Sequence, residues 1–383
     1  MRKIFPITNV CDFQGGSQPP KSEWSSISQK GYVRMLQIRD FTQSNKNYIE
    51  FVKESKSLKK CSDDDILIGR YGASIGKILT GLSGAYNVAL IKTKPKPDKL
   101  LKRYLKYILE SSEFQIFITN IGSRAAQAGF NKSDLSDFKI LLPSLFDQQR
   151  IATILDHADS IRRKNEQILE KYNELEQSVF YEMFGDLQTN PKAWPKIRLG
   201  DLGKLTSGST PSRDNPEYYK GIIPWVKTGE VNGTLILDTE EKITQDALNN
   251  SSCKLYPKNS IIIAMYGQGV TRGKVAILGI CATTNQACAV IPPNDIMNSI
   301  FLFSYLKMAY ENLREMGRGG NQPNLNVGML KDYEILNPPM ELQIRFSEVI
   351  SKIESQKHLS EQSLKKSEEL FQSLLQRAFR GEL

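Results

Sequence analysis

Apolar side chains recur every seven residues along two long segments of the chain, residues 147–184 and 342–379. Such spacing is typical of the a and d positions of a coiled coil. No Pro or Gly interrupts the first segment before Gly185, so the pattern predicts a helix of about 38 residues, roughly 57 Å long. Its predicted seam consists of Ile154, Ala158, Ile161, Asn165, Ile168, Tyr172, Leu175 and Val179.

The second segment predicts a helix of similar length whose middle seam is polar or small, at Lys357, Ser360 and Ser367. An ordinary buried helix pair is the alternative, but globular helices average about 11–12 residues. We therefore expect a spacer in which the two helices pair as an antiparallel coiled coil about a pseudo-two-fold axis. The apolar seam of the second helix is predicted to consist of Ile350, Ile353, Leu364, Phe371 and Leu374.

The rest of the chain predicts globular domains of the α/β (α+β) class. Apolar runs at 65–69, 85–91 and 260–264 are bounded by Gly and polar clusters, which is typical of strands. Helices are expected at 100–117 and 296–315. The predicted organisation is a first globular domain at 1–146, a central helix at 147–185, a linker at 186–195, a second globular domain at 196–341 and a C-terminal helix at 342–383.

The two halves are copies of one another at an offset of 195 residues. Between residues 127 and 184, 19 of the 58 aligned pairs are identical, whereas average composition gives roughly three or four. The register drifts in the front of each half, where Gly16 aligns with Gly208 and Asn87 with Asn285. Each half therefore combines a variable globular part with an element of fixed length.

Composition and charge narrow the class of protein. Lys plus Arg number 51 and Asp plus Glu 42, so the formal net charge is +9, a weak indication of a polyanionic partner. No apolar run approaches the roughly 18 residues of a membrane span, and the first residues lack the apolar core of a secretory signal. The five scattered Cys residues form no C-x-x-C pair, which favours a reduced, cytoplasmic protein.

The sequence offers no convincing catalytic arrangement. Residues 72–77 resemble a phosphate loop, but only three residues separate the glycines and Ile78 replaces the magnesium-binding hydroxyl. Residues 337–340 resemble the Asn-Pro-Pro-aromatic motif of amino-methyltransferases without its aromatic residue. His157 and His358 both fall on the predicted long helices. We therefore expect a non-catalytic chain without a metal or cofactor of its own.

Patches that mix cations, amides, aromatic rings and glycine occur in both halves. Arg and Lys can fork onto guanine, Asn and Gln onto adenine, and glycine-loop amides can hold phosphates. A solvated surface loop is the alternative for any single residue. Side chains identical in both copies, such as Gln127 with Gln322 and Asn131 with Asn326, suit a structural or phosphate role better. The candidate DNA-binding residues are Arg34, Gln37, Arg39, Arg70, Tyr71, Lys77, Arg124, Lys132, Lys227, Thr228, Tyr266, Gln268, Arg272, Lys274, Arg318, Asn321 and Asn324.

Several short motifs accompany the repeat. They are Gly-Ser-x-Pro at 16–19 and 208–211, Tyr-Gly at 71–72 and 266–267, Gln-Pro-Asn-Leu-Asn at 322–326, and Leu-Pro-x-x-x-x-Gln-Gln-Arg-Ile at 142–151. With these motifs the whole chain resembles the specificity (S) subunits of Type I restriction–modification systems. It departs from the pattern at 127–131 and at 342–343, where Leu-Gln replaces Gln-Gln.

The resemblance implies that each globular domain is a target-recognition domain that reads one half of a bipartite, asymmetric site in double-stranded DNA. The helices would set the half-site spacing and dock two modification (methyltransferase) subunits, which restriction subunits join. AdoMet, ATP and magnesium would belong to those partners. The residues alone leave two alternatives: a coiled-coil adaptor whose basic loops bind acidic proteins, and an orphan methyltransferase, which the missing cofactor motif opposes.

Overall fold

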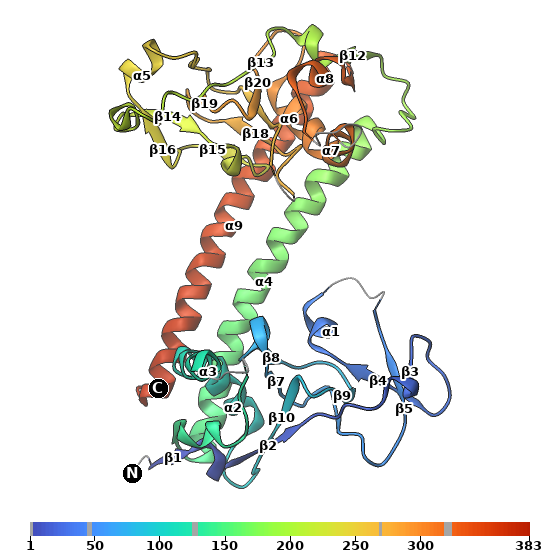
Figure 1. Cartoon of the computed structure of the whole chain (residues 1–383), viewed down its shortest axis with the longest axis vertical. Coiled ribbons are helices and arrows are strands. Elements are labelled where there is room, and N and C mark those ends of the chain that lie inside the picture. Colours follow the sequence, from blue (N-terminus) through green and yellow to red (C-terminus); the bar gives the residue numbers. More distant parts are fainter. Residues whose placement is uncertain (1–2, 44–47, 125–128, 268–269, 318–323) are drawn as a thin grey trace. The chain divides into compact units, whose positions relative to one another are not determined.

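The computed structural model describes residues 3–43, 48–124, 129–267, 270–317 and 324–383, with the backbone alone at 3 and 122–124 (Figure 1). The chain divides into two compact units. Unit 1 contains Met1–Glu166 and Gln362–Leu383, and unit 2 contains Gln167–Glu361. These bounds differ from the predicted domains because each unit takes in one end of both long helices.

The two long helices are α4 (Leu145–Phe184) and α9 (Met340–Arg380), within a few residues of their predicted bounds. The Ser144 hydroxyl accepts the amide of Asp147 at 3.1 Å where α4 begins, and Gly185 follows its end with a φ of 82°. In unit 1 the start of α4 shares a core with the end of α9, and in unit 2 the end of α4 shares a core with the start of α9. The pairing is therefore antiparallel, as predicted.

One row of the predicted α4 seam is wrong. Ile161, Ile168 and Leu175 are 51%, 41% and 44% exposed, and Ile154 is only half-buried. The row that is buried lies one residue later: Leu155 joins the core of unit 1, and Arg162 places its guanidinium 5.7 Å from the ring centre of Phe371 on α9.

The other seam residues are buried or half-buried. Ala158 is buried, and Asn165 donates to the Ser367 hydroxyl of α9 at 3.1 Å. Tyr172 and Val179 pack against the core of unit 2. On α9, Ile350, Ile353 and Phe371 are buried, and Leu364 and Leu374 are half-buried.

Unit 1 carries small sheets in which all neighbours pair antiparallel except β4 and β9, which are parallel. In order across each sheet, the strands are β1 (Lys3–Pro6) with β11 (Lys139–Leu142); β2 (Cys11–Gly15), β10 (Leu90–Pro95), β7 (Leu67–Gly69) and β8 (Ile78–Leu79); and β3 (Trp24–Ser25), β5 (Phe51–Lys53), β4 (Tyr32–Leu36), β9 (Gly84–Tyr86) and β6 (Lys60–Cys61). Its shorter helices are α1 (Ile38–Thr42), α2 (Lys102–Glu110) and α3 (Ser112–Arg124).

Unit 2 has a similar plan, with two parallel pairs, β14 with β19 and β15 with β18, among otherwise antiparallel neighbours. In order, the strands are β12 (Lys196–Arg198) with β21 (Glu334–Leu336); β13 (Thr206–Ser207), β20 (Cys288–Ile291), β17 (Ile261–Ala264), β18 (Val275–Leu278) and β15 (Leu235–Ile236); and β16 (Glu241–Ile243), β14 (Ile223–Val226) and β19 (Thr283–Thr284). Its shorter helices are α5 (Gln245–Asn249), α6 (Ser299–Met308), α7 (Tyr310–Met316) and α8 (Val327–Asp332).

Three predicted elements are interrupted. The single strand expected at 85–91 is two strands, β9 and β10, belonging to different sheets. The helices expected at 100–117 and 296–315 each break into two, at Ser111 and Ala309. Both breaks let the second helix turn back onto the core, where Phe114 and Leu313 are fully buried.

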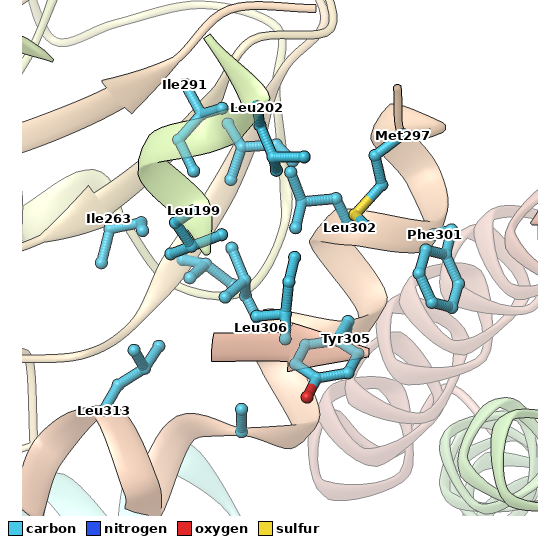
Figure 2. Close-up of a cluster of buried hydrophobic side chains, with 14 of the residues drawn as sticks. Leu199, Leu202, Ile263, Ile291, Met297, Phe301, Leu302, Tyr305, Leu306 and Leu313 are labelled. Carbon is cyan, nitrogen blue, oxygen red and sulfur yellow. The ribbon is translucent and has the colours of Figure 1, made fainter. Parts of the chain in front are cut away.

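Each unit packs its sheets and helices around an apolar core that includes the long helices. In unit 2, α6 lies between the globular part and the long helices. Figure 2 shows Leu302 directed toward Leu199 and Leu202, and Phe301 on the opposite side of α6. The Phe301 ring stacks on Phe180 of α4 with centroids 6.1 Å apart. This packing holds the globular part of the unit onto the helix pair.

Buried glutamines anchor the start of each long helix. The side chain of Gln148 accepts the Leu101 amide at 2.9 Å and donates to the Pro143 carbonyl at 3.1 Å. Gln343, its repeat partner, accepts the Asn298 amide at 2.9 Å and donates to the Pro338 carbonyl at 2.8 Å. Both side chains are fully buried, so the shared glutamine of the helix-opening motif has a structural role.

None of the helices in the described part of the chain is both long enough and apolar enough to cross a membrane.

Candidate nucleic-acid interface

The Gly-Ser-x-Pro motif builds the same turn in both units. A Cβ at Gly16 would overlap the carbonyl oxygens of Tyr86 and Asn87, and a Cβ at Gly208 would overlap the Thr284 side chain and the Thr284 and Asn285 carbonyls. The backbone amide of the serine that follows donates to a strand carbonyl at 2.9 Å in each unit, Ser17 to Tyr86 and Ser209 to Thr284. Glycine is therefore required by a close backbone approach.

A second shared feature is the turn that follows β4 in unit 1 and β14 in unit 2. The amide of Gln37 donates to the Asp40 carboxylate at 2.8 Å, and the amide of Lys227 donates to the Glu230 carboxylate at 2.7 Å. The same turn thus presents different side chains in the two units. In unit 2 it is also joined to the first turn, since the Thr228 hydroxyl donates to the Asn285 side chain at 3.2 Å.

The Tyr-Gly pairs are solvent-facing in both units. Tyr71 is 39% and Tyr266 is 41% exposed. In unit 1 the guanidinium of Arg70 lies 5.0 Å from the ring centre of Tyr71 and donates through Nε to the Phe130 carbonyl at 2.6 Å. In unit 2 the Leu325 amide, at the repeat-equivalent of Phe130, donates to Met265 at 3.0 Å. Each Tyr-Gly turn therefore lies beside the segment that leads to the asparagine present in both copies, Asn131 in unit 1 and Asn326 in unit 2.

Those asparagines have a structural role. The Asn131 side chain accepts the amides of Ser133 at 2.8 Å and Asp134 at 3.2 Å. The Asn326 side chain accepts the amide of Met329 at 2.9 Å and caps α8. Both side chains therefore hold a turn. Their predicted companions, Gln127 and Gln322, lie outside the described residues.

The candidate cations of the first loop in unit 1 are gathered around two carboxylates. Arg34 donates to Asp40 at 2.7 Å. Gln37 Nε2 and Arg39 Nη2 both donate to Oε2 of Glu50, at 2.6 and 2.5 Å. The Arg39 guanidinium also lies 5.4 Å from the ring centre of Tyr48. These three candidates form one cluster whose positive charge is matched by acidic side chains.

Unit 2 gathers its candidates in the same way. Lys227 Nζ is 2.6 Å from Glu240 and 3.1 Å from Glu241. Glu241 also accepts from Arg213 at 2.8 Å. The hydrogen bond from Arg213 lowers the pKa of Glu241, so this carboxylate stays ionised at neutral pH. Arg213 in turn lies over the rings of Tyr219 and Trp225, at 4.0 and 5.1 Å from their centres.

The comparison with known families decides what these loops belong to. Residues 2–177 and 191–369 match the family described as the Type I restriction modification DNA specificity domain. The chain belongs to the specificity-subunit family of Type I restriction–modification systems. DNA sequence recognition is the activity that this family supports.

Relatives and solved structures agree. The chain is 23% identical over 369 residues to the Type I restriction enzyme MjaIX specificity subunit of Methanocaldococcus jannaschii, covering 90% of this chain and 82% of that protein. It is 30% identical over 161 residues to the EcoR124I/EcoR124II specificity subunit of Escherichia coli, covering 41% of this chain and 40% of that protein. The fold resembles the S subunit from M. genitalium, with a TM-score of 0.62 and 15% identity over 99% of this chain and 96% of the other.

The remaining candidates of this specificity-subunit chain lie apart from the two clusters. Lys77 is exposed and makes no ion pair with any residue that the structure describes. Lys132 is paired with Asp12, whose pKa the lysine lowers. Lys274 donates to Asn232 at 3.2 Å, and Arg272 is half-buried against Gly317. Asn324 is exposed, whereas Gln268, Arg318, Asn321 and the side chain of Arg124 lie outside the described part of the chain.

Residue type alone missed the acidic members of the site and Arg213. Asp40, Glu50, Glu230, Glu240 and Glu241 organise the cations, yet none resembles a DNA ligand by charge. The sequence held one usable signal: the three-residue spacing from Gln37 to Asp40 and from Lys227 to Glu230 is that of a capping box. Among the described residues, no cluster of His, Cys, Asp and Glu is placed to hold a metal ion.

Proposed function

We propose that this chain is the non-catalytic subunit that directs its complex to a bipartite, asymmetric site in double-stranded DNA, with unit 1 and unit 2 each reading one half-site. The observation that carries the proposal is a repeated frame that presents different side chains. The Gly-Ser turn, the capped loop and the asparagine cap recur in both units. At the loop, however, Gln37 and Arg39 in unit 1 correspond to Lys227 and Gly229 in unit 2.

The same frame with different, partly exposed side chains suits two readers of different base sequences. Base identity is read by side chains that reach donor and acceptor groups in the grooves, whereas the frame supplies position. An adaptor for acidic proteins would gain nothing from pairing the cations of both clusters with carboxylates. That charge balance favours selective reading over general attraction to a polyanion.

The helix pair is proposed to set the half-site spacing and to dock two modification (methyltransferase) subunits, with restriction subunits joining through them. Support comes from a likeness to a chain solved in work on complex assembly of the type I R-M system, with a TM-score of 0.58 over 100% of this chain and 98% of the other. AdoMet, ATP and magnesium are proposed to belong to these partners.

The test uses the full chain co-expressed with its modification subunits. Methylated bases are mapped by sequencing, for the wild type and for a variant that lacks residues 166–172 and 358–364. Each deletion removes one whole heptad and leaves the contact between Asn165 and the Ser367 hydroxyl in place, so the seam register is kept on both helices. Seven residues are about 10.5 Å of helix, or roughly three base pairs of B-DNA.

We expect an asymmetric two-part motif in the wild type, and the same half-sites with a shorter spacer in the deletion variant. A symmetric or one-part motif would refute two-unit reading. An unchanged spacer would refute the role of the helices. Binding of the same complex to duplex DNA should weaken steeply with salt, and absence of binding to duplex DNA would favour the adaptor.

A further inference from the structure

The cluster of polar side chains in each unit contains a glutamate, Glu50 in unit 1 and Glu241 in unit 2. The offset of the sequence repeat does not align these two glutamates. In unit 1, β4 runs antiparallel to β5, with Arg34 opposite Phe51, and the Met35 amide donates to the Glu50 carbonyl at 2.8 Å. Glu50 therefore stands opposite Met35. In unit 2 the register of β14 with β16 places Glu241 opposite Trp225.

Met35 and Trp225 are equivalent positions. Each lies one residue before the end of its strand, β4 or β14. Both strands have a parallel neighbour: Met35 lies opposite Ala85 of β9, and Trp225 lies opposite Thr283 of β19. The residues that follow them, Leu36 and Val226, accept the amides of Asn87 and Asn285 through their carbonyls. Glu50 and Glu241 thus occupy the same place in the two units.

Each of these carboxylates holds two polar side chains of its recognition loop. Glu50 accepts from Gln37 and Arg39 through one oxygen, and Glu241 accepts from Arg213 and Lys227 through separate oxygens. In each unit the arginine also rests on an aromatic face, and both carboxylates keep 27% of their side-chain surface exposed.

The arginine that is held comes from a different segment in each unit. Arg39 belongs to the short helix α1 that follows β4, whereas Arg213 belongs to the loop after the Gly-Ser turn, where unit 1 has Lys21. The carboxylate is thus constant while its cationic partner varies. A purely local ion pair would be expected to vary together with its partner.

We propose that Glu50 and Glu241 are equivalent positioning residues for base recognition, each fixing the orientation of its loop's cationic and amide side chains and limiting their attraction to phosphates. This proposal rests on the proposed function. A fixed arginine presents its remaining donors in one direction, as bidentate contact with a base edge requires. The nearby negative charge makes sequence-independent phosphate contact less favourable.

The test replaces each glutamate by its neutral isostere, Glu50→Gln and Glu241→Gln, in the full chain with its modification subunits. Mapping of methylated sites should show relaxed base preference in one half-site for each variant, and in a different half-site for the two. Discrimination at the affected position should fall about 5- to 150-fold, the range of one bidentate contact.

Binding to non-target duplex DNA is the second measurement. Affinity should rise in both variants, and the slope of log K against log salt should steepen by about one for each cation released. Glu54→Gln and Glu217→Gln are matched controls, because these glutamates are 56% and 72% exposed and each pairs with a single lysine. Both controls should keep the wild-type motif and slope.

Glu241→Asp separates charge from position. It should relax the motif without changing the salt slope, because the charge is kept while the carboxylate is withdrawn. If Glu241→Gln does not fold, this variant decides, and an unchanged motif in it overturns the proposal. An unchanged motif in both Gln variants, or a switch to a new preferred base, which would make the carboxylate itself the reader, overturns it as well. Absence of any sequence-specific methylation by the wild-type complex would instead refute the proposed function.

Discussion

Removal of the Phe346 side chain on α9 should strongly destabilise unit 2. The side chain is fully buried, and its ring centre lies 5.6 Å from Phe180, 5.2 Å from Phe184 and 6.2 Å from Phe301. It therefore joins α9 to α4 and to the α6 helix of the globular part. Phe346→Ala should lower the free energy of unfolding by about 4 kcal/mol, since a Phe→Ala substitution that leaves a cavity in a core typically costs 3–5 kcal/mol. For a unit of this size, that lowers the unfolding midpoint by roughly 8–16 °C.

Differential scanning calorimetry of the full chain measures this midpoint. The matched control is Phe146→Ala on α4, because the Phe146 side chain is 78% exposed and its loss should change stability by no more than about 0.5 kcal/mol. A loss below about 1 kcal/mol for Phe346→Ala, or one equal to the control, would refute the idea that this aromatic cluster fastens the globular part to the helices.

Three further outcomes are expected. Gly208→Ala should displace the turn that contacts Thr284, and methylation mapping should show weakened reading of one half-site with the other intact. Burial opposes ionisation of Asp65, but hydrogen bonds from the Ser62 amide and Lys92 lower its pKa from 3.8 to about 2. Stability from this carboxylate, about 2 kcal/mol, is present above pH 4 and lost as pH falls toward 2, and urea unfolding should show Asp65→Asn flattening that dependence. Lys77→Ala should weaken binding to all DNA sequences alike and reduce the salt slope by about one, as titrations at several salt concentrations would show.

The long helices were predictable in length but not fully in orientation. Heptad spacing counts apolar residues, so it favoured Ile161 over Arg162. In the structure, however, the guanidinium of Arg162 covers Phe371, and the buried Glu176 is neutralised by Lys307 at 3.0 Å. Such partners are invisible to a one-dimensional pattern. The sequence repeat indicates the correct row, because its offset of 195 residues aligns Leu155 with the seam residue Ile350.

The recognition loops were predictable in outline only. Residue type pointed to Arg39 and Lys227, and repeated motifs pointed to the turns that carry them. The equivalent glutamates were not predictable from the repeat, because the segment between Gln37 and Glu50 is one residue shorter than the segment between Lys227 and Glu241. The offset that aligns the two loops therefore does not align the two glutamates. Strand register, a property of three-dimensional pairing, is what makes them equivalent.

The composition of unit 1 also fixes an order of events during synthesis. Its core is completed by Phe371, Leu375 and Ala378, which the ribosome adds only after every residue of unit 2. Unit 2 is a single continuous stretch, so it can close while α9 is still being extended. At about 5–20 residues per second, the half that is translated first waits many seconds for its missing helical turns. Unit 1 is thus made first and completed last, and chains interrupted near their end would carry a completed unit 2 and an exposed apolar core in unit 1.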